Sequence, residues 1–122
     1  MIFIVDDSKA VREHLAKMLS EINGARIAGQ ARNFDEAIDG IRKFKPGLVI
    51  LDIQMPGGTG IEVLRIIKQY DHPMIVLVLT NHSNPQYRKK CLALGADYFL
   101  DKNKDIGRVK QILEDFVELH AE

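Results

Sequence analysis

Residues 48–60 read Leu48-Val49-Ile50-Leu51-Asp52-Ile53-Gln54-Met55-Pro56-Gly57-Gly58-Thr59-Gly60. The first four are apolar and follow Pro46 and Gly47, which is typical of a short strand buried on both faces of a sheet. The proline and the three glycines at the end of this stretch predict that the strand stops and a loop with unusual backbone angles follows. We therefore expect Asp52 at the carboxyl end of a parallel strand, where open α/β sheets bind their ligands.

The size and composition are those of an ordinary globular domain. With 122 residues, 46% of them hydrophobic and 28% charged, the chain is expected to form one domain over residues 1–122. Its 17 basic and 17 acidic residues balance, which argues against direct nucleic-acid binding and favours a protein partner. No apolar run approaches the roughly 18 residues that span a bilayer, and no signal-peptide pattern is present. We expect a cytoplasmic protein, in agreement with the single Cys91.

Apolar runs of strand length alternate with helical stripes along the chain. The expected strands are Ile2–Val5, Arg26–Ala31, Leu48–Leu51, Met74–Leu79 and Asp97–Leu100. The expected helices cover residues 11–22, 34–44, 61–70, 85–94 and 106–116. Because the connections are short, this alternation predicts an α/β fold, a doubly wound parallel sheet of five strands with five helices on its two faces.

Local signals mark several helix boundaries. Asn33 and Asn84 predict N-caps, supported by Glu36 three residues after the first and by Pro85 at the first helical position of the second. The expected stops are Asn23-Gly24, Pro46, Pro73 and Gly95.

Polar side chains follow four of the five strands at their carboxyl ends. They are Asp6 and Asp7, Asp52, Thr80 and Lys102. These ends meet at one edge of a parallel sheet, so we expect the side chains to lie together. Three neighbouring carboxylates repel one another unless a cation is bound, and an all-oxygen set favours a hard divalent ion such as Mg²⁺. A hydroxyl and an ammonium beside them suit a transferring phosphoryl group.

Each of these residues also has a purely structural interpretation. In this interpretation, the two aspartates after the first strand and Ser8 do no more than cap a helix, and Asp52 does no more than cap a turn. Thr80 could satisfy a backbone group, and Lys102 could be a solvated loop residue. Their occurrence together at four strand ends favours a site over a set of unrelated roles.

As a set, these motifs resemble those of response-regulator receiver domains of two-component signalling, in particular the single-domain chemotaxis type. The resemblance covers essentially the whole chain and rests on Val5-Asp6-Asp7-Ser8, Leu51-Asp52-Ile53-Gln54-Met55-Pro56 with Gly60, Leu79-Thr80-Asn81 and Gly95–Lys102. It implies a flavodoxin-like fold with strand order 2-1-3-4-5.

The resemblance also implies a metal site and a phosphoacceptor. Asp52 would accept the phosphoryl group, and with Asp7 it would bind Mg²⁺ directly. Asp6 would act through a metal-bound water. Gln54 would supply its backbone carbonyl to the metal, so its side chain would not be the ligand.

The remaining implied roles concern the phosphoryl group and its consequences. Thr80 and Lys102 would bind phosphoryl oxygens, and Phe99 matches the family's switching aromatic. Gln54 and His82 occupy positions that tune hydrolysis, each two residues beyond an active-site strand end. We expect their side chains to control how water approaches the phosphoryl group.

The implied function is a phosphorylation-controlled signalling switch in a two-component phosphorelay. A histidine kinase or phosphotransfer protein would supply the phosphoryl group in a Mg²⁺-dependent reaction. The response would alter a protein-interaction face around the fourth helix, fifth strand and fifth helix, recognised by an unknown downstream protein. The chain would not be an enzyme beyond its own phosphorylation and dephosphorylation.

Two other functions use the same fold class. A haloacid-dehalogenase-like, Mg²⁺-dependent aspartyl-phosphate hydrolase also has a strand-end aspartate, but such enzymes resemble Asp-x-Asp at the nucleophile and this chain has Asp52-Ile53-Gln54. A flavodoxin-like electron carrier would need a phosphate cradle after the first strand, where Asp6-Asp7 would repel the phosphate.

Two positions depart from the receiver pattern. Asn103 follows Lys102 where the family usually has a proline, often in a cis bond. We expect this to change the geometry of the loop rather than the chemistry. Asn81 replaces the small residue usual after Thr80 and is expected to narrow access to the phosphoryl group.

Overall fold

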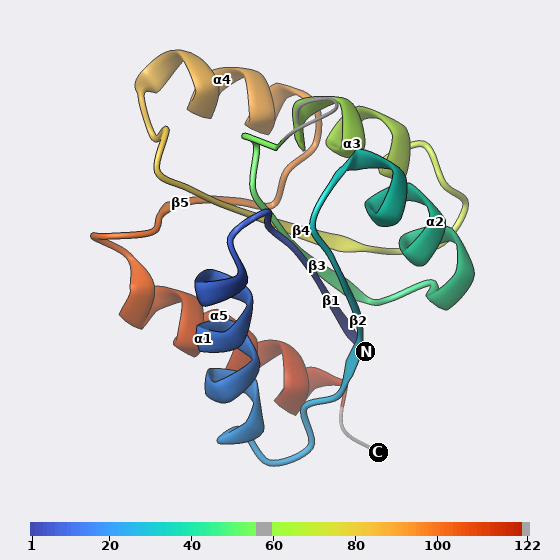
Figure 1. Cartoon of the computed structure of the whole chain (residues 1–122), viewed down its shortest axis with the longest axis vertical. Coiled ribbons are helices and arrows are strands. Elements are labelled where there is room, and N and C mark those ends of the chain that lie inside the picture. The colour runs from blue at the N-terminus through green and yellow to red at the C-terminus, as the bar shows by residue number, and fades with distance from the viewer. Residues whose placement is uncertain (56–59, 121–122) are drawn as a thin grey trace.

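Five parallel strands form one sheet in the order β2-β1-β3-β4-β5 (Figure 1). The computed structural model describes residues 1–55 and 60–120. The strands are β1 Ile2–Val5, β2 Ile27–Ala31, β3 Leu48–Leu51, β4 Ile75–Thr80 and β5 Tyr98–Asp101. The helices are α1 Lys9–Ser20, α2 Phe34–Phe44, α3 Gly60–Ile67, α4 Pro85–Ala93 and α5 Ile106–Leu119. The predicted fold class and strand order are confirmed.

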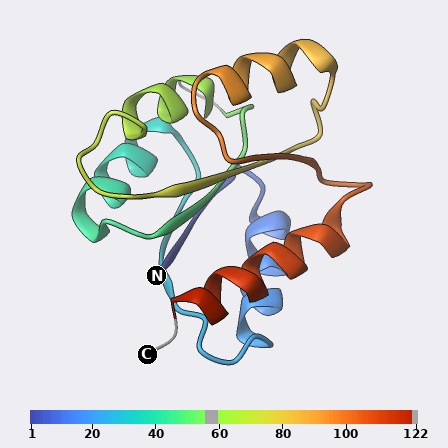
Figure 2. The same ribbon diagram turned by 180° about the vertical axis from the view of Figure 1, so that it is seen from behind.

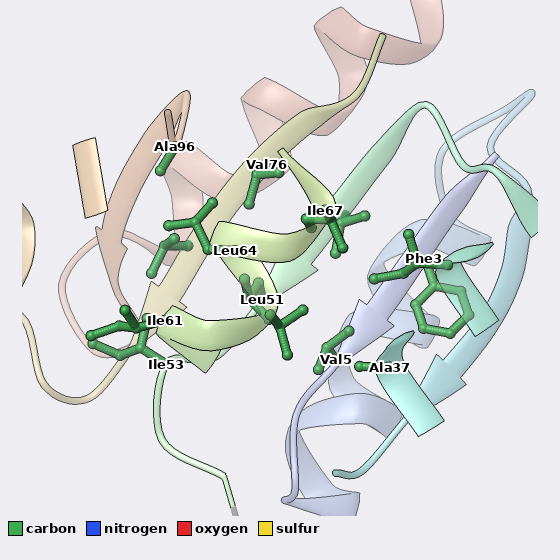
Figure 3. Close-up of a cluster of buried hydrophobic side chains, with 14 of the residues drawn as sticks. Phe3, Val5, Ala37, Leu51, Ile53, Ile61, Leu64, Ile67, Val76 and Ala96 are labelled. Atoms are coloured by element: carbon green, nitrogen blue, oxygen red, sulfur yellow. The ribbon is translucent and has the colours of Figure 1, made fainter. Parts of the chain in front are cut away.

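The helices cover both faces of the sheet. Helices α1 and α5 lie on one face, and α2, α3 and α4 lie on the other (Figures 1 and 2). Because successive side chains of a strand point to opposite faces, β1 contributes to both cores. Phe3 and Val5 join the cluster beneath α2 and α3 (Figure 3), whereas Ile2 and Ile4 join the cluster that contains Leu15 of α1.

Strand β3 lies in the middle of the sheet and is buried on both faces, as its apolar run predicts. Its four side chains are at most 1% exposed. It pairs with β1 on one side and β4 on the other. The ladder continues one residue further, because the Asp52 N–H donates to the Val5 carbonyl at 3.0 Å. Asp52 therefore leaves the sheet beside the end of β1.

The predicted N-caps are confirmed. Asn33 Oδ1 accepts the Glu36 N–H at 2.9 Å, and Asn84 Oδ1 accepts the Tyr87 N–H at 3.0 Å. Gly95 follows α4 with a φ of 105°, a left-handed conformation that favours glycine.

Several predicted boundaries are wrong by one to three residues. Helix α1 ends at Ser20 rather than at Asn23-Gly24, and α3 ends at Ile67 rather than at Tyr70. In both places the chain continues in a tighter turn whose N–H groups bond three residues back, as from Tyr70 to Ile67. Strands β4 and β5 are each shifted one residue along from the prediction, so that they end at Thr80 and Asp101, which pair with each other. The predicted loop residues 56–59 lie outside the described part of the chain.

No helix within residues 1–55 and 60–120 is long and apolar enough to cross a membrane. This finding agrees with the sequence, which has no apolar run of that length.

Gly60 begins α3 against the backbone that carries Asp52, and this contact generates a prediction. A Cβ at Gly60 would lie 1.9 Å from the Asp52 carbonyl oxygen and 2.6 Å from the Ile53 Cα. Since backbone atoms must shift to relieve these contacts, Gly60→Ala should lower the free energy of unfolding by about 1–3 kcal/mol or more in urea titrations.

Gly107→Ala is the matched control. Apart from its chain neighbours and the backbone of its own helix, no atom lies within 4 Å of a Cβ built at Gly107 in α5. Alanine should therefore raise the free energy of unfolding there by about 0.5–1 kcal/mol. Equal stability of the two variants would contradict the role given to Gly60.

Candidate functional site

The ends of β1 and β3 bring three carboxylates together. One oxygen from each of Asp6, Asp7 and Asp52 lies within 4.8 Å of the others. Asp6 and Asp52 are 2% and 4% exposed, whereas Asp7 is exposed. The predicted cluster therefore forms from two buried carboxylates and a third at the surface.

Lys102 reaches this cluster from the end of β5, two strands away from β3. Its Nζ lies 2.6 Å from Asp6 Oδ2 and 3.1 Å from Asp52 Oδ2. The ammonium thus bridges the two buried carboxylates, and the interpretation of Lys102 as a solvated loop residue is wrong.

The electrostatics of the cluster are set by burial and by these charges. Burial raises the pKa of Asp52, and the charge of Asp6 adds to this, against the lowering effects of Lys102 and of the Gln54 N–H. Burial alone would lower the pKa of Lys102, but its hydrogen bond to Asp6 and the two carboxylate charges raise it. One ammonium faces three carboxylates, so the cluster carries an excess of negative charge. That excess and the all-oxygen donor set fit a hard divalent cation such as Mg²⁺.

The loop between β1 and α1 serves both the helix and the cluster. Ser8 Oγ accepts the Val11 N–H at 3.2 Å and so caps α1. Asp6 Oδ1 accepts the Ser8 N–H at 2.9 Å, and the Asp6 carbonyl accepts a bond from the Arg12 guanidinium at 2.7 Å. The capping interpretation is therefore correct for Ser8, and Asp6 combines a structural bond through Oδ1 with the Lys102 contact through Oδ2.

Thr80 ends β4 and is completely buried. Its Oγ1 accepts the His82 N–H at 3.0 Å, so it does satisfy a backbone group, as the structural interpretation allowed. The hydroxyl keeps its own O–H for donation. The Lys102 N–H donates to the Thr80 carbonyl at 3.0 Å, which joins the ends of β4 and β5 through their backbones.

The other predicted residues lie around this centre. The Gln54 N–H donates to Asp52 Oδ1 at 3.2 Å. His82 is exposed, and its ring lies edge-on to Tyr87 of α4 with 6.5 Å between centroids. Phe99 is 5% exposed within the core, and its carbonyl accepts a bond from Arg88 of α4 at 3.2 Å.

Asp101, which has no predicted role, lies at the centre of a hydrogen-bond network. Its carboxylate accepts bonds from the Ser83 hydroxyl and from the N–H groups of Asn103 and Lys104. The Ser83 bond, followed by the two backbone bonds, lowers the pKa of Asp101. An aspartate at the end of a strand can accept the backbone N–H two residues further on, so this turn could have been predicted from Asp101.

Comparison with known proteins gives one family for almost the whole chain. A family model described as the response regulator receiver domain matches residues 2–114. Over 113 residues the chain is 35% identical to a protein-glutamate methylesterase/protein-glutamine glutaminase of Methanospirillum hungatei, covering 91% of this chain and 33% of that protein. It is 37% identical to a putative transcriptional regulator of Pseudomonas aeruginosa, covering 88% of this chain and 52% of that protein. The chain thus spans about a third to a half of the length of these relatives.

Solved structures of receiver domains share the fold. The signal receiver domain of a DNA-binding response regulator from Colwellia psychrerythraea matches with a TM-score of 0.87 and 27% identity, covering 96% of this chain and 97% of that one. The receiver domain of NarL from Mycobacterium tuberculosis matches with a TM-score of 0.84 and 27% identity, covering 96% and 94%.

The raised pKa of Asp52 generates a prediction about stability. The native state binds this proton more tightly than the unfolded state, so the wild type loses stability as the pH rises from below the ordinary value of 3.8 through the folded pKa. Asp52→Asn lacks this cost and should raise the melting temperature at pH 7, without divalent metal, by roughly 2–5 °C.

The pH dependence of the difference is the control. Below a pH of about 3.8 the wild-type carboxyl is protonated in both states, so the two melting temperatures should converge there. A lower melting temperature for Asp52→Asn at pH 7 would contradict the assignment of burial as the dominant effect.

Proposed function

Since the chain belongs to the response-regulator receiver family, whose members are phosphorylation-controlled switches of two-component signalling, we propose that residues 1–122 form one such domain and that Asp52 is its phosphoacceptor. The observation that carries this proposal is the buried Asp52 carboxylate at the end of β3, in contact with Lys102 and close to Asp6 and Asp7. The haloacid-dehalogenase alternative is not supported, and the family match also argues against an electron carrier.

The three aspartates are the proposed Mg²⁺ site. Asp7 and Asp52 would bind the metal directly, Asp6 would act through a metal-bound water, and Gln54 would supply its backbone carbonyl. When bound, Mg²⁺ would offset the charge of the carboxylates and of the phosphoryl oxygens. The exposure of Asp7 supports this assignment, because it leaves one side of the cluster open to solvent.

The proposed reaction is a displacement at phosphorus. A carboxylate oxygen of Asp52 forms a bond to the phosphorus of a phosphohistidine, the P–N bond breaks, and the donor imidazole leaves with the electron pair. The Lys102 ammonium, 3.1 Å from Asp52 Oδ2, and the buried Thr80 hydroxyl would donate to the phosphoryl oxygens. The domain carries out only this transfer and the later hydrolysis.

The proposed partners follow from this chemistry. A histidine kinase or phosphotransfer protein supplies the phosphoryl group, and a downstream protein of unknown identity recognises the result. A cytoplasmic location belongs to the same proposal.

Helix α4, β5 and α5 form the proposed output face. Val78 of β4 pairs with Phe99 of β5, and Arg88 of α4 donates to the Phe99 carbonyl. A hydrogen bond from Thr80 to a phosphoryl group would therefore change the positions of α4 and β5 through these contacts, with Phe99 as the proposed switching side chain.

Phosphorylation of Asp52 is tested by incubation with Mg²⁺ and acetyl phosphate, followed by intact-mass measurement. The wild type should gain one phosphoryl group, because Asp52 displaces acetate from the donor. Asp52→Asn should gain none. Equal labelling of the two proteins would contradict the assignment of Asp52 as the phosphoacceptor.

The metal site is examined in the same assay. Asp7→Ala should lose most of the dependence of labelling on Mg²⁺ concentration, since a direct ligand is removed. Asp39→Ala is the matched control, an exposed aspartate on α2 away from the cluster, and should behave as the wild type.

The lifetime of the phosphorylated state is the subject of a further prediction. His82 follows Thr80 by two residues and is exposed beside the site, so removal of its imidazole should change access of water to the phosphoryl group. His82→Ala should change the dephosphorylation rate of Asp52 several-fold after removal of acetyl phosphate. His72 precedes β4 and so lies at the amino-terminal end of the strands, away from the site. His72→Ala should therefore leave the dephosphorylation rate unchanged. Identical phosphoryl half-lives in wild type and His82→Ala would show that His82 is a surface residue without this role.

A further inference from the structure

Two aspartates hold the loop after β5, and Asp101 accepts most of their hydrogen bonds. Its Oδ1 accepts the N–H groups of Asn103 at 2.7 Å and Lys104 at 3.0 Å. Its Oδ2 accepts the Ser83 hydroxyl at 2.5 Å. Asp105 makes two further bonds within this loop. Its carboxylate accepts the Asp101 N–H at 2.8 Å, and its N–H donates to the Asp101 carbonyl at 3.0 Å.

Lys102 lies inside this network. Its N–H donates to the Thr80 carbonyl, and its neighbours Asp101 and Asn103 are joined by the carboxylate-to-amide bond. The backbone of Lys102 is therefore fixed on both sides, while its ammonium contacts Asp6 and Asp52. The carboxylate of Asp101 accepts from Ser83 and the two backbone amides, so its influence on the ammonium passes through the backbone.

The bond to Ser83 joins this loop to a second one. Ser83 follows β4 in the segment that begins at Thr80, and the Thr80 hydroxyl is held by the His82 N–H. The two proposed donors to the phosphoryl group, Thr80 and Lys102, thus lie where two loops begin, and the bond from Ser83 to Asp101 joins these loops.

We propose that Asp101 is a positioning residue for Lys102, with Ser83 as its anchor on the neighbouring loop. This inference rests on the proposed function and deepens it. A lysine side chain loses rotamer freedom when its ammonium is held at one point, and the loss is smaller when its backbone is already fixed. The Asn103 N–H bond requires a residue other than proline, since a proline nitrogen has no hydrogen to donate. This chain therefore fixes the loop by hydrogen bonds to a carboxylate where the family pattern has a proline ring.

The alternative is that Asp101 only stabilises the loop. A double-mutant cycle separates the two roles, because a residue that acts through Lys102 has no effect once that ammonium is gone. The measured quantity is the initial rate of labelling by acetyl phosphate at saturating Mg²⁺ in the full chain.

Asp101→Ala should lower the labelling rate on the order of tenfold, since small displacements of a positioned group have effects of this size. Asp101→Asn keeps an oxygen for the two backbone amides and should lose less. Ser83→Ala removes only the bond between loops and should also lose part of the rate. In a Lys102→Ala background, Asp101→Ala should produce no further loss.

Asp39→Ala is again the matched control and should label as the wild type. Binding of Mg²⁺ at the proposed site should raise the melting temperature of the wild type, and the same rise should occur in Asp101→Asn and Ser83→Ala, since the proposed metal ligands are intact. These two variants keep the test decisive if Asp101→Ala does not fold.

Two results would overturn the positioning role. One is a wild-type labelling rate in both Asp101→Asn and Ser83→Ala, or in Asp101→Ala if that variant folds. The other is that Asp101→Ala lowers the labelling rate by the same factor in the wild-type and Lys102→Ala backgrounds. A failure of the proposed function is distinguishable, because the wild type itself would then remain unlabelled or Asp52→Asn would be labelled.

Discussion

The bridge that Lys102 makes between Asp6 and Asp52 is the interaction on which the carboxyl edge of the sheet depends. Two carboxylates buried side by side repel each other and destabilise the fold unless a cation lies between them. The ammonium comes from the end of β5, whereas the carboxylates follow β1 and β3. The three-residue contact therefore forms only when all these strands stand in the observed order.

Much of this arrangement could be predicted because parallel strands place their carboxyl ends along one edge. The apolar runs located the strands to within about a residue, and the polar residues that follow them were expected to meet. The caps at Asn33 and Asn84 were predictable for a similar reason, since an N-cap depends on residues three positions apart. Local geometry was enough in each case.

The features that sequence reasoning missed depend on contacts between loops. The bond from Ser83 to Asp101 joins residues 18 positions apart, and no spacing rule places them together. The ends of α1 and α3 were missed because their last turns tighten to bonds three residues back, which leaves the apolar pattern unchanged. The functional and structural interpretations were also not exclusive, since Thr80 satisfies a backbone N–H while its hydroxyl proton remains available for donation.

Asp6 and Asp52 divide their oxygens in the same way. In each, Oδ1 accepts a backbone N–H two residues along, from Ser8 or from Gln54, and Oδ2 faces the Lys102 ammonium. One oxygen thus fixes the carboxyl group to its own loop, which limits its rotation, while the other meets the charge from β5. In the proposed reaction, either oxygen of Asp52 that took up a phosphoryl group would already lie beside a donor, the backbone amide at Oδ1 or the ammonium at Oδ2. Both are hydrogen-bond donors, so the orientation of this carboxyl group already suits an anionic product.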